Sequence, residues 1–216
     1  MGGTSDQLLE IYHRLDDYFG PLNWWPAENS FEVIVGAVLT QNTNWKNVEK
    51  SIDSLKRVNL LNFDALLHMP VEQLADLIRS SGYYNLKARR LKNLLEMFAR
   101  DYEGDLSLLF SEDISTAREA LLQVKGIGAE TADSILLYAG GHATFVVDAY
   151  THRILSRHNL IPEVCDYQTI HDLFMDNLDH DAVMFNQYHA LLVRTAKQFC
   201  KKGTPLCAEC PLEPLL

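Results

Sequence analysis

Three cysteines stand close together near the C-terminal end of the sequence, in the stretch FCKKGTPLCAEC. They are Cys200, Cys207 and Cys210, and Cys165 is the remaining thiol of the chain. The first residues, MGGTSDQLLE, contain neither the basic nor the apolar segment of a secretory signal peptide. We therefore expect a reducing cytoplasm, where clustered cysteines indicate a metal site or free thiols rather than disulfides.

A second candidate site is the segment VKGIGAE, in which two glycines flank Ile127. Glycine costs about 1 kcal/mol relative to alanine inside a helix, so the pair indicates a tight turn between two helices. Gly126 and Gly128 would permit positive φ angles and would keep Cβ atoms away from a ligand. Unpaired backbone N–H groups of such a turn can bind a phosphate oxygen. An ordinary glycine-terminated helix is the alternative.

The third candidate is Asp148, which follows the apolar run FVV and precedes AYTHRIL. That sequence is typical of a helix start, so the simplest role of Asp148 is to cap the helix N-terminus. A carboxylate can also stabilise positive charge or accept a proton during a reaction. Both roles can belong to the same side chain.

Helices must position these residues, because apolar side chains recur at helical spacing along the chain. The first stripe consists of Leu8, Leu9, Tyr12, Leu15 and Phe19. FEVIVGAVL, with Ser30 as its cap, is apolar nearly all round and predicts a buried central helix. Further helices are predicted over 45–58, 71–78, 86–98, 114–122, 131–138, 148–158, 171–177 and 182–199. No convincing strand pattern is present, so we predict an all-α fold of about ten short helices.

Composition limits the function classes. The chain has 216 residues, 47% of them hydrophobic, which is enough for one large domain or two lobes with a core. No apolar run approaches the roughly 20 residues of a membrane span, so no membrane partner is expected. The formal net charge is −10, so any DNA-binding surface must be local.

The segments LLQVKGIGAETADSILLYA and FVVDAYTHRIL resemble the helix-hairpin-helix DNA glycosylase superfamily, which includes endonuclease III. The family has a leucine-rich helix, a G-[IV]-G turn, a threonine–alanine pair and an aspartate after an apolar run; here the pair is Thr131–Ala132 and the aspartate is Asp148. AVLTQNT and SGYYNLKARRL resemble its DNA-facing segments. The resemblance covers nearly the whole chain, and within the family it favours the small bacterial 3-methyladenine DNA glycosylases.

The resemblance implies two helical lobes with a cleft for DNA and the target base between them. A six-helix lobe over 28–135 would contain the hairpin, and residues 1–27 with 136–216 would form the second lobe. The expected partner is damaged double-stranded DNA, bound by a monomer in a bacterial or archaeal cytoplasm without a nucleotide cofactor.

The resemblance also implies a reaction. Asp148 occupies the catalytic position, where a carboxylate stabilises an oxocarbenium-like sugar as the base departs. Bifunctional members carry a lysine two residues after the second glycine, and it forms a Schiff base with the sugar. That position is Glu130 here, and a carboxylate cannot form an imine, so we predict no lyase step. Lys125, which precedes the first glycine, is expected to contact a phosphate rather than to replace the missing nucleophile.

Aromatic residues indicate the base pocket. Trp24 and Trp25 follow the first helix and Trp45 follows LTQNT, as in the 3-methyladenine enzymes. Indoles suit a flipped, positively charged alkylpurine, through stacking and cation–π attraction. The alternative is that these tryptophans pack between the lobes.

Other residues are implied to meet DNA. Gln41, or Asn42 beside it, is placed to fill the gap left by the flipped base, unless the two form an ordinary loop tip. Asn85, Lys87, Arg89 and Arg90 are weak candidates for backbone contacts. The hairpin residues expected to bind DNA are Lys125, Gly126, Ile127, Gly128, Glu130 and Thr131, with the Ile127 side chain anchoring the turn in the core.

The cysteines match most of the family's iron–sulfur motif, C-x6-C-x2-C-x5-C. Cys200, Cys207 and Cys210 fill the first three positions, and the fourth falls on Leu216, which cannot bind iron. A [4Fe–4S] cluster with one ligand that is not a cysteine, a zinc ion, or no metal are the three possibilities.

The leading hypothesis is a monofunctional DNA glycosylase for alkylated purines of the 3-methyladenine type. One alternative is an endonuclease III-like glycosylase for oxidised pyrimidines. The other is a DNA-binding module without catalysis.

Overall fold

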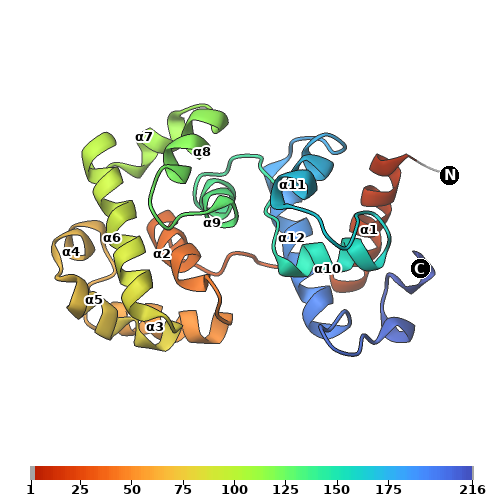
Figure 1. Cartoon of the computed structure of the whole chain (residues 1–216), viewed down its shortest axis with the longest axis horizontal. Coiled ribbons are helices and arrows are strands. Elements are labelled where there is room, and N and C mark those ends of the chain that lie inside the picture. The colour runs from red at the N-terminus through yellow and green to blue at the C-terminus, as the bar shows by residue number, and fades with distance from the viewer. Residues whose placement is uncertain (1–2, 216) are drawn as a thin grey trace. The chain divides into compact units, whose positions relative to one another are not determined.

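The computed structural model describes residues 3–215, and all the regular structure in this range is helical (Figure 1). The α-helices are α1 (Thr4–Phe19), α2 (Ser30–Thr40), α3 (Trp45–Arg57), α4 (Phe63–His68), α5 (Val71–Leu77), α6 (Tyr84–Asp101), α7 (Leu106–Ser111), α8 (Ile114–Leu122), α9 (Ala129–Ser134), α10 (Ala149–Arg157), α11 (Tyr167–Met175) and α12 (Ala182–Gln198). Single turns of 3₁₀-helix cover η1 (Arg79–Ser81), η3 (Cys207–Glu209) and η4 (Glu213–Leu215), and η2 (Ile135–Ala139) is π-helical. The predicted all-α class is confirmed.

The chain divides into two compact units. The hairpin unit consists of Ala27–His142 and the terminal unit combines the residues up to Pro26 with those from Ala143 onward. The sequence placed the second boundary earlier, after residue 135. The π-helical turn η2 continues α9 directly and packs against α2, so the whole of this helix stays with the hairpin unit.

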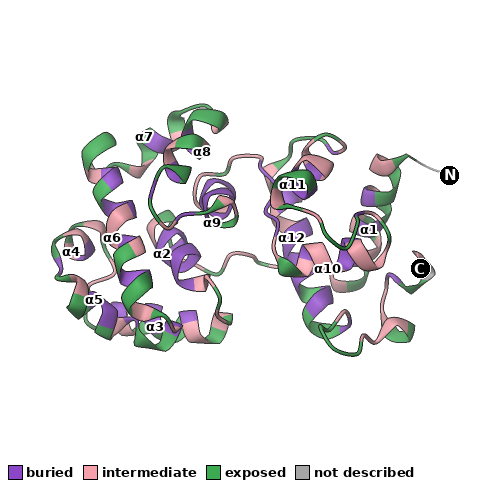
Figure 2. Ribbon diagram, in the orientation of Figure 1, coloured by how far each residue is buried: buried purple, intermediate pink, exposed green. Residues whose placement is uncertain are grey.

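The hairpin unit is built around α2, which is buried along most of its length (Figure 2). Val33 to Leu39 all lie in the core, as the apolar sequence predicted. The predicted cap was wrong by one residue: the Asn29 side chain accepts from Glu32 N at 3.0 Å, while the Ser30 hydroxyl donates to the carbonyl of Ala139. This second contact attaches the start of α2 to the end of η2.

Two short helices, α4 and α7, were not predicted. Each has only six residues, too few for a helical hydrophobic period to stand out. Asn62 and Asp105 cap them by accepting backbone hydrogen bonds, and both pack on the core through one buried leucine. The capping residues Asn62 and Asp105 are therefore the features of the sequence from which these two helices could have been predicted.

Lys87 on α6 lies inside the hairpin unit, with 1% of its surface exposed. Its ammonium group donates to the carbonyls of Leu39 at 2.8 Å and Ser81 at 2.6 Å. These bonds join the end of α2 to the η1 turn before α6. The predicted role of Lys87 as a surface phosphate contact is therefore wrong, because its charged end is used within the fold.

Replacing Lys87 with methionine should lower the free energy of unfolding by about 2–4 kcal/mol at neutral pH, because two buried carbonyls lose their donor. Burial, and then the neighbouring Arg90 charge, lower the pKa of Lys87 from 10.5 to about 8. The unfolded chain therefore binds the proton more tightly between pH 8 and 10.5, and the wild type gains stability relative to K87M as pH rises through this window. Urea unfolding at pH 7 and pH 10 measures both effects, and a difference that does not widen would contradict the buried charge.

The terminal unit packs α12 against α1 and α10. Tyr188 of α12 is fully buried and donates its hydroxyl to the carbonyl of Leu8 on α1, at 2.8 Å. Phe145 stacks on Phe174 with 3.6 Å between ring centroids. This aromatic core fixes the segment 143–148, which leads into α10 and sets the position of Asp148.

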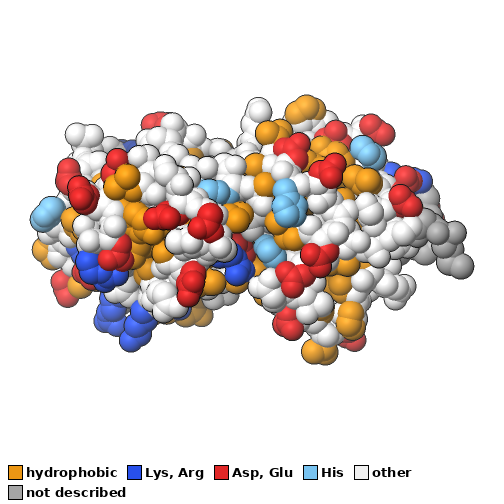
Figure 3. Space-filling model, turned by 90° about the horizontal axis from the view of Figure 1, so that it is seen from above, with side chains coloured by type: hydrophobic (Ala, Val, Ile, Leu, Met, Phe, Trp, Pro, Cys, Tyr) orange, Lys and Arg blue, Asp and Glu red, His pale blue; other side chains and the backbone are white. Residues whose placement is uncertain are grey.

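No helix among residues 3–215 is both long and apolar enough to cross a membrane. On the face shown in Figure 3, acidic side chains are scattered over both units, in keeping with the net charge of −10.

Candidate active site and DNA-binding hairpin

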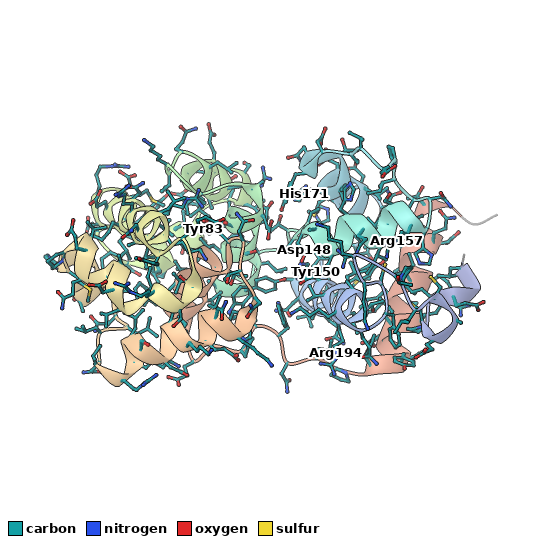
Figure 4. The ribbon with its side chains drawn as sticks, turned by 60° about the horizontal axis from the view of Figure 1, so that its bottom comes forward. Tyr83, Asp148, Tyr150, Arg157, His171 and Arg194 are labelled. Atoms are coloured by element: carbon teal, nitrogen blue, oxygen red, sulfur yellow. The ribbon has the colours of Figure 1, made fainter. Side chains whose placement is uncertain are left out.

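Asp148 is the N-cap of α10 in the terminal unit (Figure 4). Its Oδ1 atom accepts from Tyr150 N at 2.9 Å, Thr151 N at 2.8 Å and the Thr151 hydroxyl at 3.0 Å. The predicted capping role is confirmed. Because capping uses Oδ1, the second oxygen of the carboxylate points elsewhere.

That second oxygen, Oδ2, lies 3.5 Å from Nε2 of His189, a buried residue of α12. Burial would raise the pKa of Asp148, but the contact with His189 and the hydrogen bonds from Thr151 outweigh it, and the pKa is lowered. The carboxylate is therefore ionised at neutral pH, with 13% of the side chain exposed. A carboxylate in this state can stabilise positive charge that develops beside it.

The tryptophan pair also lies next to His189. The Trp24 ring meets the His189 ring edge-on, with 6.4 Å between centroids, and the Trp25 ring is 5.8 Å from Trp24. The terminal unit thus brings together an aromatic pair, a histidine and a carboxylate. His189 was missed by the sequence analysis, since a single histidine on an apolar helix gives no signal of its own.

Trp45, the third predicted pocket residue, belongs to the hairpin unit. It is the first residue of α3, where it is half-buried and packs against the hydrophobic core of that unit. This contact gives Trp45 a structural role within its own unit.

The glycine hairpin joins α8 to α9. Gly126 has φ of 101°, a conformation that glycine adopts without strain, whereas Gly128 has φ of −101° and caps α9. Of the two glycines that would permit a positive φ, only Gly126 adopts one. An added Cβ at Gly128 would meet no atom within 4 Å, so its backbone is open to a ligand. Ile127 is buried, as predicted, and ties the turn to the core.

Gln41 braces this hairpin from the end of α2. Its amide nitrogen donates to the Gly126 carbonyl at 3.2 Å and to the Thr131 hydroxyl at 2.9 Å, and its amide oxygen accepts from Arg90. Gln41 therefore uses its amide within the hairpin unit. Asn42, the next residue, is exposed, with φ of 52°.

The other predicted DNA contacts differ in exposure. Lys125 and Glu130 are exposed at the two ends of the hairpin. Thr131 is buried and holds Gln41, so its side chain supports the turn. Of the second predicted segment, Arg90 also supports the turn, through Gln41 and by packing against Gly126.

Replacing Gly126 with alanine should destabilise the hairpin unit by about 2–4 kcal/mol, because a positive φ is strained for alanine and its Cβ would overlap Cγ of Arg90. Gly128→Ala is the matched control, with an expected change below about 0.5 kcal/mol in unfolding but a loss of DNA affinity. Equal destabilisation of the two variants would contradict this division of roles.

The C-terminal cysteines line one pocket at the end of α10 and α12, together with Arg157 and Phe199. Arg153 donates to the Cys200 carbonyl at 2.7 Å, and Arg157 donates to Cys200 Sγ at 3.2 Å and to the Lys201 carbonyl at 2.8 Å. Figure 4 shows Arg157 at the far end of α10 from Asp148. Leu216, at the fourth motif position, lies outside the described residues.

The sequence profile of the HhH-GPD superfamily of base excision DNA repair proteins matches residues 35–180, a range that includes both the hairpin and Asp148. With this match, the hairpin and the capped carboxylate define a DNA N-glycosylase, an enzyme that releases damaged bases in base excision repair. The chain belongs to the HhH-GPD superfamily.

Three relatives illustrate the range of this similarity. A protein of Methanocaldococcus jannaschii, named as a candidate DNA repair glycosylase, is 46% identical over 96% of this chain and 94% of its own length. Endonuclease III of Sulfolobus acidocaldarius is 28% identical over 85% of this chain and 80% of its own. The solved structure of the H. pylori 3-methyladenine DNA glycosylase MagIII, bound to 1,N6-ethenoadenine, is 29% identical, with a TM-score of 0.77 over 91% of this chain and 98% of its own.

Proposed function

We propose that this DNA glycosylase removes alkylated purines of the 3-methyladenine type from double-stranded DNA. The observation that carries the proposal is the cluster of Trp24, His189 and Asp148 in the terminal unit, in which His189 lies beside both an indole ring and an ionised carboxylate. The similarity to the H. pylori 3-methyladenine glycosylase supports the same substrate class.

The chemistry of the substrate suits this cluster. A glycosylase reaches its target by swinging the nucleotide out of the base stack. A 3-alkylated adenine carries positive charge, so an indole face such as that of Trp24 attracts it by stacking and by a cation–π contribution of about 0.5–2 kcal/mol. It is also a good leaving group, and its departure needs no strong general acid.

Asp148 then acts on the sugar. As the base leaves, positive charge develops at the anomeric carbon, and the carboxylate stabilises it in a partly buried site of low dielectric. Oδ1 is held by α10, so Oδ2 is the oxygen we assign to this charge and to the attacking water. Cleavage transfers the bond electrons to the purine, and water supplies the hydroxyl group at the sugar.

The hairpin unit contributes DNA backbone binding. No atom lies within 4 Å of the position that a Cβ of Gly128 would take, so a phosphate oxygen can approach the backbone N–H groups of the turn. Lys125 adds a positive charge beside them. We assign to Asn42 the filling of the gap left by the flipped base, a role first expected of Gln41. Asn42 is exposed, whereas the Gln41 amide is hydrogen-bonded to Thr131.

The proposal is tested by incubating the enzyme with methylated duplex DNA and identifying the released bases. We expect 3-methyladenine among the products and no release from a duplex containing thymine glycol. Release of thymine glycol alone would favour the oxidised-pyrimidine function. The oxidised-pyrimidine function is supported by the similarity to endonuclease III. It is disfavoured by Glu130, which occupies the position of the lyase lysine and cannot form an imine.

We further propose that His189 is a positioning residue for Asp148. His189→Leu should slow base release by about tenfold to a hundredfold, because small displacements of a catalytic group are costly. DNA affinity should change less than about twofold. Single-turnover rates and binding curves separate the two effects, and His189→Gln, which keeps an N–H donor, should recover part of the rate. A loss of binding equal to the loss of rate would show that His189 acts only on structure.

A further inference from the structure

The pocket around the three cysteines contains a fourth side chain that can bind a metal. His158, the residue that ends α10, lines the same pocket as Cys200, Cys207 and Cys210. All four side chains belong to the terminal unit.

The two ring nitrogens of His158 differ in their partners. Its Nδ1 atom is buried and has no hydrogen-bond partner among the described residues. The ring also forms a hydrogen bond with the backbone of Leu215. A histidine that binds a metal through one nitrogen commonly donates its other N–H to a backbone carbonyl or carboxylate, which fixes the ring. A buried ring nitrogen without a partner is otherwise costly.

One of the three sulfurs lies beside a cation. The Arg157 guanidinium donates to the sulfur of Cys200 at 3.2 Å, and a cation beside a thiol stabilises its ionised form. Arg153 and Arg157 also hold the Cys200 and Lys201 carbonyls, so the cysteine loop is fixed from α10, the helix that ends in His158. Leu212 is fully buried and secures the other side of the loop.

We propose that Nδ1 of His158 is the fourth ligand of the [4Fe–4S] cluster that the family's motif implies at Cys200, Cys207 and Cys210. An imidazole nitrogen is an accepted iron ligand, since histidines replace cysteines at one iron of Rieske centres. His158 contacts the backbone of Leu215, so it lies beside the stretch in which the family's motif has its fourth cysteine.

A cluster fits this donor set better than a single zinc ion. Among residues 3–215, no three His, Cys, Asp or Glu side chains converge on one metal position. Zinc needs its ligands on one atom, whereas the four ligands of a cubane bind four separate irons. The cluster supplies no step of base release in the scheme above. Its role would be to hold the C-terminal loop to α10.

The experiment purifies the full chain without oxygen, reconstitutes it with iron and sulfide, and measures iron, sulfide, zinc and the visible spectrum. We expect about four irons per chain and a brown absorbance in the wild type. His158→Ala should lose most of the iron, and His158→Cys should retain it, because a thiolate replaces the imidazole. His152→Ala, on the same helix but outside the pocket, is the matched control and should bind iron as the wild type does.

A second readout identifies the ligand directly. Pulsed EPR of the reduced wild type should show coupling to a ¹⁴N nucleus that is absent from His158→Cys. An iron-free wild type, or zinc in place of iron, would overturn the cluster. Full iron content in His158→Ala together with the absence of a ¹⁴N coupling would overturn the assignment of His158. None of these measurements depends on which base the enzyme releases. A result that contradicts the ligand assignment of His158 therefore leaves the proposed substrate class untouched, and the reverse also holds.

Discussion

Replacing Asp148 with asparagine is expected to lower the rate of base release by on the order of 10³-fold while leaving the fold intact. Asparagine is as good an N-cap as aspartate, so its side-chain oxygen can still accept from Tyr150 N and Thr151 N. It cannot provide the charge that the Oδ2 atom directs beside His189. The substitution therefore separates the two roles of this residue. Single-turnover release of 3-methyladenine from methylated duplex DNA is the measurement.

Asp181 offers a matched control, because it caps α12 in the same manner, by accepting from Val183 N and Met184 N. Asp181→Asn should reproduce any effect of weakening a cap on thermal stability and should leave base release nearly unchanged. DNA affinity should be similar in both variants. If D148N released bases at the rate of the wild type, Asp148 would be a structural cap only, and the catalytic group would have to be sought elsewhere.

The acid side of the pH profile gives a related check on Asp148. Its pKa is lowered in the folded chain, so the charge is present above the ordinary carboxyl value and is lost only as pH falls through the lower folded value. Stability from this group and the catalytic charge therefore disappear together in the acid range, below about pH 4.

The features that the sequence predicted well are those set by residues close together in the chain. The burial of α2 follows from an unbroken apolar run, and the cap at Asp148 follows from the residues beside it. The Ile127 anchor between two glycines is equally local. Neighbouring residues did not settle the exact end of an element. Either Asn29 or Ser30 could cap α2, and the structure uses Asn29. Either glycine of the hairpin could adopt a positive φ, and only Gly126 does.

The features that the sequence could not predict depend on contacts between distant residues. Gln41 and Thr131 are 90 positions apart, and their hydrogen bond, which supports the hairpin, has no signal in the sequence. Lys87 was placed with the surface charges because its type favours solvent, and only the fold reveals the two carbonyls that hold it. His189 became a candidate when α12 placed it beside Asp148. In each case a polar side chain found its partner through tertiary packing.

Replacing Glu130 with lysine is expected to introduce a covalent step that the wild type lacks. A lysine amine at this position attacks the anomeric carbon of an abasic site, water leaves, and an imine forms, which borohydride reduces to a stable bond between protein and DNA. Glu130 is exposed in the first turn of α9, where exchanging an acidic for a basic side chain costs about 0.3–1 kcal/mol through the helix dipole. Trapping on an abasic duplex should be absent from the wild type and evident for E130K.

The trapping result also depends on pH, because only the neutral amine attacks. The yield for E130K should rise with pH toward the ordinary lysine pKa of about 10.4, and Glu130→Gln, which removes the charge without adding an amine, should give no trapped product. A trapped complex in the wild type would contradict the monofunctional assignment, and Lys125, the other lysine of the hairpin, would then be the residue to replace. A trapped complex confined to E130K would instead show that the hairpin still presents position 130 to the sugar, and that one side chain decides between hydrolysis alone and strand cleavage.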